Sequence, residues 1–150
     1  AQGRSIRVRI VDTSVLLPAV SPSLPQHKPA KAALEAAIND DRPVGLVWVV
    51  VTGFVRLTTK PGLFEHPLTI AEAWELVDGW LEHPNVRVVQ ETEEHARLWS
   101  ELLCNVGTGG NLTTDAWIAA IALAHGASVL TFDSDFARFP NVRWESPLSE

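Results

Sequence analysis

Cysteine and long apolar runs are both scarce in this sequence. Cys104 is the one cysteine among 150 residues, which excludes an internal disulfide and a cysteine-based zinc site. The longest apolar run covers residues 117–124, whereas a membrane-spanning helix needs roughly 18 such residues. The first residues lack the apolar segment and the cleavage site of a signal peptide. These absences predict a cytoplasmic protein.

Positive charge is also in short supply. The chain has 12 Lys and Arg against 18 Asp and Glu, which gives a formal net charge of −6. This balance argues against bulk electrostatic attraction to nucleic acid, although an enzyme can still act on nucleic acid through a local basic rim. An acidic total is also expected where carboxylates gather around a metal ion. The aspartates are therefore the first candidates for a functional site.

The length and the order of the segments predict one α/β domain over residues 1–150. No repeat or linker divides the chain, and residues 1–5 are expected to be disordered or a remnant of expression. Short β-rich runs alternate with longer helical patterns, which is typical of a mainly parallel sheet covered by helices. Strands are expected at 6–11, 86–89, 128–132 and 142–144, and helices at 29–38, 68–81, 92–106 and from 111 or 113 to 125.

The segment 44–59 is ambiguous, whereas 68–81 is the clearest helix. Valine and threonine favour a strand in 44–59, and the spacing of its larger side chains fits a helix less well. In 68–81, Thr69 and Glu72 match a capping box. One apolar stripe runs along this helix and is expected to enter the core. Its residues are Ile70, Ala73, Trp74, Val77, Trp80 and Leu81.

Two of the predicted strands run directly into an aspartate. The strand at 6–11 precedes Asp12, and the strand at 128–132 precedes Asp133. In open α/β sheets, ligands bind at the carboxyl ends of the strands, around the point where the strand order reverses. Asp115, in the first turn of the helix that leads into the second of these strands, adds a third carboxylate. The three side chains are therefore expected to face one crevice.

Three carboxylates without a basic neighbour repel one another, and burying them is costly unless a cation pairs them. Mg²⁺ or Mn²⁺ fits such a group, because both are hard ions that prefer oxygen ligands and keep several waters. Such an ion suits phosphodiester hydrolysis, since it activates water and stabilises the leaving oxygen. Each aspartate also has a simpler explanation as a turn, cap or helix-dipole residue. Their consistent placement favours a site.

Three short motifs stand in order along the chain. They are Ile-Val-Asp-Thr-Ser-Val-Leu-Leu at 10–17, Thr-Asp-Ala-Trp-Ile-Ala at 114–119 and Leu-Thr-Phe-Asp-Ser-Asp-Phe at 130–136. Together they resemble the PIN domain family, and more narrowly the VapC toxins of bacterial type II toxin–antitoxin modules. The resemblance covers nearly the whole chain. The segments similar to a mycobacterial-type subgroup are 53–57, 109–112 and 136–140.

The resemblance implies a PIN-like three-layer α/β/α sandwich with a central, mainly parallel sheet, in which residues 48–58 form a helix. It also implies a toxin endoribonuclease that uses Mg²⁺ or Mn²⁺ to cleave structured RNA, either tRNA or rRNA, and thereby inhibits translation. The partners that it implies are a second copy in a homodimer and a cognate VapB-type antitoxin. The C-terminal segment of that antitoxin is expected to cover the acidic groove.

Gly53 stands where most PIN nucleases carry a glutamate, and glycine cannot bind a metal. Either Asp12, Asp115 and Asp133 work with waters alone, or another acid compensates, or the activity is weak. We favour a working enzyme with fewer protein ligands, because the residues around Gly53 match the subgroup. The alternative is a degenerate PIN domain that binds RNA or a protein partner without cleavage. A phosphatase of the haloacid dehalogenase type fits less well, because Ser14 stands where that family expects a second aspartate.

The hypothesis is therefore a metal-dependent endoribonuclease in which Asp12, Asp115 and Asp133 are the catalytic and metal-binding residues. The side chains expected to orient these ligands or their waters are Thr13, Ser14, Asn111, Thr131 and Asp135. For Asp135, capping of the turn that follows is an equally simple role. The basic residues expected to contact RNA or the antitoxin are Arg56 and Arg138.

Overall fold

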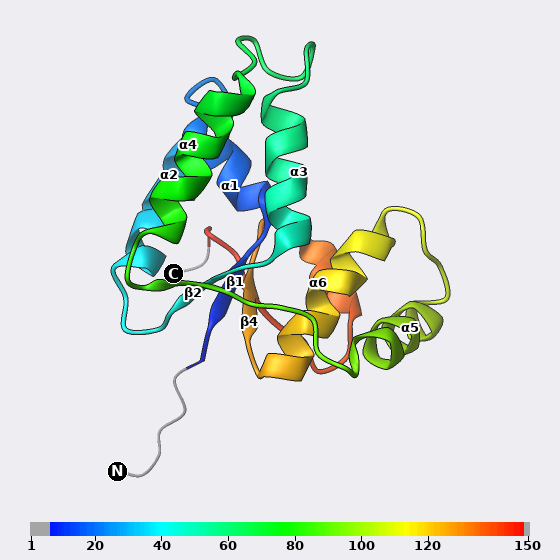
Figure 1. The fold of residues 1–150 in the computed structure, drawn as a ribbon. Coiled ribbons are helices and arrows are strands. Elements are labelled where there is room, and N and C mark those ends of the chain that lie inside the picture. Colours follow the sequence, from blue (N-terminus) through cyan, green and yellow to red (C-terminus); the bar gives the residue numbers. More distant parts are fainter. Residues whose placement is uncertain (1–6, 149–150) are drawn as a thin grey trace.

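The structure, a computed structural model, describes residues 7–148 as a small sheet with helices on both sides (Figure 1). The expectation for residues 1–5 lies outside this range. The strands are β1 (Arg9–Val11), β2 (Val44–Leu46), β3 (Val86–Val88), β4 (Ser128–Leu130) and β5 (Arg143–Glu145). The helices are α1 (Thr13–Val20), α2 (His27–Ile38), α3 (Trp48–Thr58), α4 (Ile70–Leu81), α5 (His95–Val106), α6 (Leu112–His125) and the 3-10 helix η1 (Ser134–Arg138). Every helix within the described range is too short or too polar to cross a bilayer.

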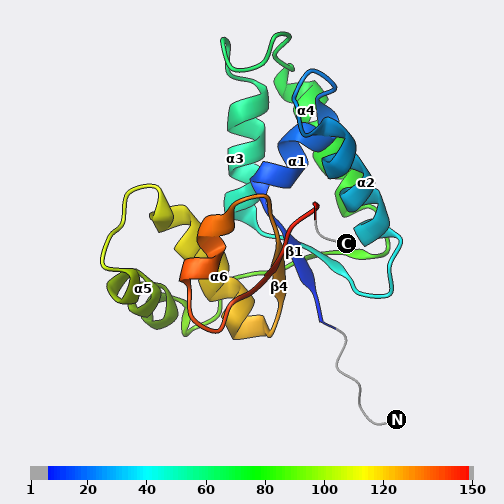
Figure 2. The ribbon, with the colours of Figure 1, turned by 180° about the vertical axis from the view of Figure 1, so that it is seen from behind.

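The five strands form one parallel sheet in the order β3-β2-β1-β4-β5. The chain moves outwards from β1 to β3, returns to β4 beside β1, and ends at β5. The strand order therefore reverses between β1 and β4, where Ile10 pairs with Val129. Helices α1 to α4 gather on one side of the sheet, and α5 and α6 on the other (Figures 1 and 2). The predicted α/β fold with a mainly parallel sheet is confirmed.

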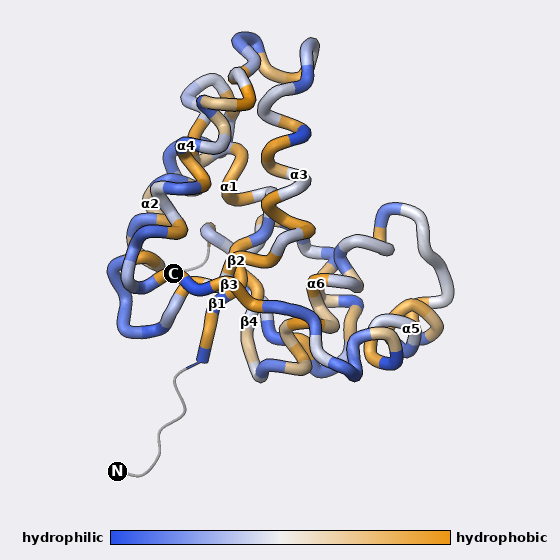
Figure 3. The backbone as a smooth tube through the Cα atoms, viewed as in Figure 1, coloured by the Kyte–Doolittle hydropathy of each residue, from blue (hydrophilic) through white to orange (hydrophobic). Residues whose placement is uncertain are grey.

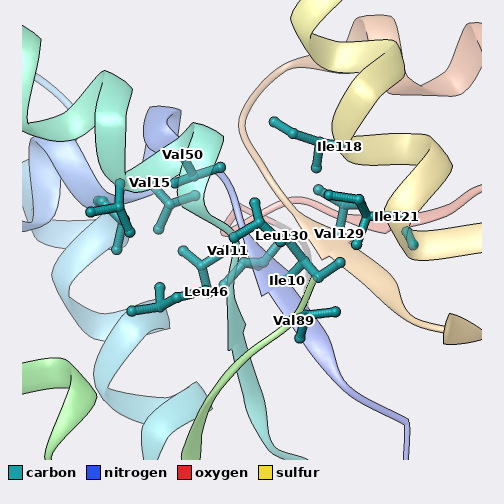
Figure 4. Close-up of a cluster of buried hydrophobic side chains, with 14 of the residues drawn as sticks. Ile10, Val11, Val15, Leu46, Val50, Val89, Ile118, Ile121, Val129 and Leu130 are labelled. Atoms are coloured by element: carbon teal, nitrogen blue, oxygen red, sulfur yellow. The ribbon is translucent and has the colours of Figure 1, made fainter. Parts of the chain in front are cut away.

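The hydrophobic core lies on both faces of the central strands. Figure 4 shows Val15 and Val50 packed on one side of β1 and β4, and Ile118 and Ile121 on the other. Because both faces of the sheet are covered, the central strands β2 and β4 are buried at every residue. The apolar residues concentrate in these strands and in the helix faces that meet them (Figure 3). The core therefore extends to Val11 and Leu130, the last residues of β1 and β4.

The ambiguous segment 44–59 divides into a strand and a helix. Strand β2 ends at Leu46 and helix α3 begins at Trp48, so the helix implied by the family resemblance is confirmed. The strand that propensity favours is wrong beyond Leu46. Phe54 of α3 is fully buried, and its ring meets that of Trp80 edge-on with 5.0 Å between the centroids. Packing of this kind outweighs the β propensity of a valine-rich segment.

Helix α4 confirms the capping box but not the whole apolar stripe. The hydroxyl of Thr69 accepts from the N–H of Glu72 (3.0 Å), and the carboxylate of Glu72 accepts from the N–H of Thr69 (2.9 Å). Val77 is fully buried, whereas the side chains of Ile70 and Trp74 are 63% and 44% exposed. The prediction that the entire stripe enters the core is therefore wrong. Part of it faces outwards.

Candidate metal centre

Asp12 stands between β1 and α1, and its carboxylate has three hydrogen-bond donors. Oδ1 accepts from the backbone N–H of Thr13 (2.8 Å). Oδ2 accepts from the hydroxyls of Ser14 (3.0 Å) and Thr131 (2.8 Å). Burial raises the pKa of Asp12 above its ordinary value, although these bonds act in the opposite direction. The carboxylate is thus held in one orientation at the point where the strand order reverses.

The two hydroxyls that bind Asp12 also bind the end of β4. Ser14 Oγ accepts from the backbone N–H of Phe132 (3.1 Å), and Thr131 Oγ1 accepts from the backbone N–H of Asp133 (2.9 Å). Each hydroxyl therefore accepts a hydrogen bond from a backbone N–H beyond β4 and donates one to Asp12. This arrangement fixes the position of Asp12 relative to Asp133.

Asp133 and Asp115 lie close enough together for Asp133 to raise the pKa of Asp115. Asp133 caps η1, because its Oδ1 accepts from the N–H of Asp135 (2.9 Å). Asp115 lies in the first turn of α6, and its side chain is hydrogen-bonded to that of Asp133. Burial raises the pKa of Asp115 from its ordinary value of 3.8 to about 8, and the bond with Asp133 and the neighbouring negative charges act in the same direction. A pKa raised this far favours a protonated Asp115 at neutral pH when no cation is bound.

Asp115, Asp133 and Asp135 form a compact carboxylate group. One oxygen of each lies within 4.8 Å of the other two. Within residues 7–148, no ion pair involves these three residues or Asp12. Acids gathered without a basic partner need either protons or a cation, and oxygen donors at this spacing suit a hard divalent cation. The residues therefore fit a metal ion.

The predicted acidic residues meet at this centre. Asp115 and Asp133 belong to the carboxylate group, and Asp12 adjoins it through the hydroxyl of Thr131. Asp135, to which the sequence assigns a supporting role, belongs to the group itself. The signal that places it there is its position two residues after Asp133, inside the turn that Asp133 caps.

The remaining predicted residues surround the centre or lie outside it. Thr13 donates its hydroxyl to the carbonyl of Val50 (3.3 Å) and so connects α1 to α3. Asn111 occupies the N-cap position of α6, where its side chain makes no capping bond. Arg138 is the exposed last residue of η1, and Arg56 is exposed on α3, where it lines a groove shared with α4. Neither arginine forms an ion pair with another described residue.

Gly53 lies beside the centre without contributing to it. A Cβ atom at this position would meet Oγ1 and Cγ2 of Thr13 at 3.4 and 3.8 Å, which are ordinary contact distances. Because Thr13 directly follows Asp12, residue 53 faces the same region but supplies no ligand. Asp135 supplies a further carboxylate from another direction, which fits the explanation that another acid compensates for the missing glutamate.

Comparison with known proteins extends these observations. A family model for the PIN domain matches residues 9–142. Ribonuclease VapC37 of Mycobacterium tuberculosis is 44% identical over 140 residues, covering 93% of this chain and 97% of the relative. VapBC2 from Rickettsia felis, solved with a promoter DNA fragment, aligns with a TM-score of 0.68 at 16% identity over 93% of this chain and 98% of that one. VapC20 of Mycobacterium tuberculosis, described as a sarcin-ricin loop cleaving toxin, aligns with a TM-score of 0.67 at 22% identity over 90% and 98%.

The chain therefore belongs to the PIN domain family, and within it to the VapC ribonucleases. The identity to VapC37 over almost the full length of both chains carries the narrower assignment. The two solved structures, which are far less similar in sequence, share the fold. The resemblance of the three motifs is confirmed.

Replacement of Asp115 by asparagine is expected to change the pH dependence of stability in the metal-free chain. The folded chain keeps the Asp115 proton up to about pH 8, whereas the unfolded chain loses it near 3.8. The free energy of unfolding therefore falls as the pH rises through this window. In Asp115→Asn the fall is smaller, and Tm at pH 8 is higher by several degrees, since ~1 kcal/mol corresponds to roughly 2–4 °C in a domain of this size.

Thermal unfolding in EDTA and in Mn²⁺ between about pH 4 and 8 measures this effect. Added Mn²⁺ raises the Tm of the wild type at pH 8 and raises that of Asp115→Asn less. Asp41→Asn, an exposed acid outside the centre, serves as the matched control. If Tm depends on pH in the same way in the wild type and in Asp115→Asn, the raised pKa of Asp115 is contradicted.

The hydroxyl of Thr131 is expected to support metal binding through Asp12. Thr131→Val keeps the shape of the side chain but removes its hydrogen bonds with Asp12, Ser14 and the N–H of Asp133, so the affinity for Mn²⁺ is expected to fall by about 10–100-fold, as for other groups that orient ligands. Thr131→Ser retains the hydroxyl and most of the affinity. Isothermal titration with Mn²⁺ compares the three proteins, with circular dichroism as a control for folding. Equal loss in both variants would assign Thr131 a purely structural role.

Proposed function

We propose that this chain is the toxin of a toxin–antitoxin module, an endoribonuclease that uses Mg²⁺ or Mn²⁺ to cleave structured RNA and so inhibits translation. One observation carries the proposal: Asp12, Asp115, Asp133 and Asp135 meet at the carboxyl end of the sheet without any basic partner among the described residues. The near full-length identity to a ribonuclease supports it.

The proposed reaction is hydrolysis of a phosphodiester bond in RNA. A water oxygen forms a bond to phosphorus, the bond from phosphorus to the leaving ribose oxygen breaks, and that oxygen takes up a proton. The metal ion supplies charge neutralisation at the phosphate and activation of water when it is bound. Asp12, Asp115 and Asp133 would hold the ion directly or through water, and Asp135 would complete the set of carboxylates.

The other residues position these groups. Ser14 and Thr131 hold Asp12 in one orientation by the bonds described above, so the carboxylate needs no rearrangement when the ion and the RNA bind. Thr13 joins this end of α1 to α3, and Asn111 stands at the start of α6, one turn before Asp115. Arg138, at the end of the turn that carries Asp133 and Asp135, would contact RNA or an antitoxin.

The relatives support a proposal for the substrate class. VapC20, which shares the fold, is described as cleaving the sarcin-ricin loop, and this favours a structured RNA of the translation machinery, either tRNA or rRNA. With such a substrate, the proposed location of the protein is the cytoplasm. The solved VapBC2 complex favours a VapB-type antitoxin as the partner. The C-terminal segment of that antitoxin would cover the carboxylate group. The toxin itself would form a homodimer.

Cleavage of purified tRNA and rRNA tests the proposal. The wild type is expected to cut at discrete sites with Mg²⁺ or Mn²⁺ and not with EDTA. Asp12→Asn and Asp115→Asn are each expected to reduce the rate at least ~100-fold, because losing a ligand costs no less than losing a group that orients one. Asp41→Asn, prepared identically, is expected to cut like the wild type.

Three results would overturn the assignment. Retained cleavage in Asp12→Asn would show that the carboxylates are not the catalytic group. If the wild type binds RNA but cleaves none, the alternative suggested by Gly53 is favoured. In that alternative the chain is a degenerate PIN domain that binds without cleaving. Turnover of a small phosphate ester would point instead to a phosphatase.

A further inference from the structure

Helix α5 lies on the outside of α6, away from the sheet (Figures 1 and 2). Its main packing partner is α6. Most side chains of α5 are exposed or half-buried, and the buried ones are His95 and Leu102. Whatever α5 contributes to the rest of the chain therefore passes mainly through α6, the helix that carries Asp115.

Three aromatic rings join α5 to α6. The rings of Trp99 on α5 and Trp117 on α6 meet edge-on, with 4.9 Å between their centroids. The ring of His95 lies edge-on to Trp117 at 4.3 Å and is stacked with Trp99 at 6.3 Å. Aromatic pairs at such separations stabilise a contact beyond the area that they bury. The side of α6 that carries Trp117 is therefore held against α5.

Both indole N–H groups of this cluster have acceptors. Trp117 Nε1 donates to the carboxylate of Glu91 (2.9 Å), in the segment that leads into α5. Trp99 Nε1 donates to the backbone carbonyl of Thr113 (3.0 Å). Thr113 belongs to the first turn of α6, two residues before Asp115. A side chain of α5 thus binds the main chain of the turn that carries Asp115.

The first turn of α6 presents opposite sides to α5 and to the carboxylate group. Thr113 and Trp117 are four residues apart and so lie on one side of the helix, the side that meets Trp99. Asp115 stands midway between them and is therefore roughly 200° around the helix from each. It faces away from α5, and its side chain is hydrogen-bonded to that of Asp133. Trp99 therefore binds the turn on the side opposite to Asp115.

Few other bonds fix this turn. Asn111 occupies the N-cap position, but its side chain makes no capping bond. Two backbone N–H groups of the turn donate to the carbonyls of Gly109 and Gly110 (3.0 and 3.1 Å). Glycine has more backbone freedom than any other residue, so this loop restrains the turn weakly. Within residues 7–148, Trp99 supplies the only hydrogen bond from another helix to the backbone of the turn.

We propose that Trp99 is a positioning residue for Asp115, which it holds in place through the backbone carbonyl of Thr113. The proposal rests on the proposed function in one respect, because it takes Asp115 as a ligand of the metal ion. The indole N–H fixes the turn before the ion binds, so Asp115 needs less rearrangement to reach it. Groups that orient a ligand in this way raise the affinity for the metal.

Trp99→Phe keeps an aromatic ring in the cluster but removes the N–H that binds Thr113. In isothermal titration, its affinity for Mn²⁺ is expected to be about tenfold lower than that of the wild type. Trp80→Phe is the matched control, because it removes an indole N–H from a ring that packs against Phe54 on the other side of the sheet. It is expected to bind Mn²⁺ like the wild type, even where its Tm falls. Equal affinities of the wild type and Trp99→Phe would overturn the proposal.

The same substitution in an Asp115→Asn background shows whether Trp99 acts through Asp115. If it does, Trp99→Phe lowers the Mn²⁺ affinity of Asp115→Asn by less than about twofold, because the two residues are coupled. A loss of about tenfold in both backgrounds would make Trp99 independent of Asp115 and would overturn the proposal.

Amide hydrogen exchange in EDTA gives a readout that needs neither metal nor RNA. Loss of the Trp99 bond is expected to speed exchange over residues 112–117 about fivefold, whereas Trp80→Phe leaves this segment unchanged. Unchanged exchange over 112–117 in Trp99→Phe would overturn the proposal. A wild type that binds Mn²⁺ but cuts no RNA would contradict the proposed function alone, so the two failures are distinguishable.

Discussion

Repulsion among carboxylates at one end of the sheet is the constraint on which the rest of this structure depends. Asp12 and Asp133 lie at the ends of β1 and β4, which are neighbours because the strand order reverses between them. Asp115 reaches the same place from the start of α6. Burial, the hydrogen bond with Asp133 and the neighbouring negative charges together raise the pKa of Asp115 to about 8, so a proton relieves part of the repulsion when no cation is bound. A divalent cation relieves it more completely.

The surrounding polar groups hold the carboxylate of Asp12 in position. The hydroxyls of Ser14 and Thr131 accept hydrogen bonds from backbone N–H groups beyond β4 and donate to Asp12, so two segments that are distant in sequence, 12–14 and 131–133, share one set of hydrogen bonds. The buried central strands and the helices that cover them keep these two segments in place.

The sequence predicts the fold and the acidic centre well, because both leave local signals. Asp12 and Asp133 directly follow two predicted strands, and the capping box marks the start of α4. Helix α1 leaves no such signal, since its eight residues are apolar almost throughout and contain Pro18. Helix α3 is rich in valine, and only contacts formed in the fold, such as that of Phe54 with Trp80, favour it over a strand.

The sequence does not predict the role of a residue when that role depends on contacts formed only in the folded chain. Asp135 joins the carboxylate group because the turn capped by Asp133 directs it there. The outward position of Ile70 and Trp74 depends on how α4 is rotated against α3, which the spacing of apolar residues alone does not specify. Arg56, equally plausible as a nucleic-acid contact, shares a groove with these side chains.

The most direct test of the central claim is the number of protons that Mn²⁺ binding releases. Isothermal titration near pH 7 in buffers of different ionisation enthalpy measures this number. Because Asp115 still holds its proton at that pH, binding of the ion at this centre is expected to release about one proton in the wild type, and markedly less in Asp115→Asn. Binding without proton release, or no binding at all, would contradict the assignment of the four aspartates to a metal centre.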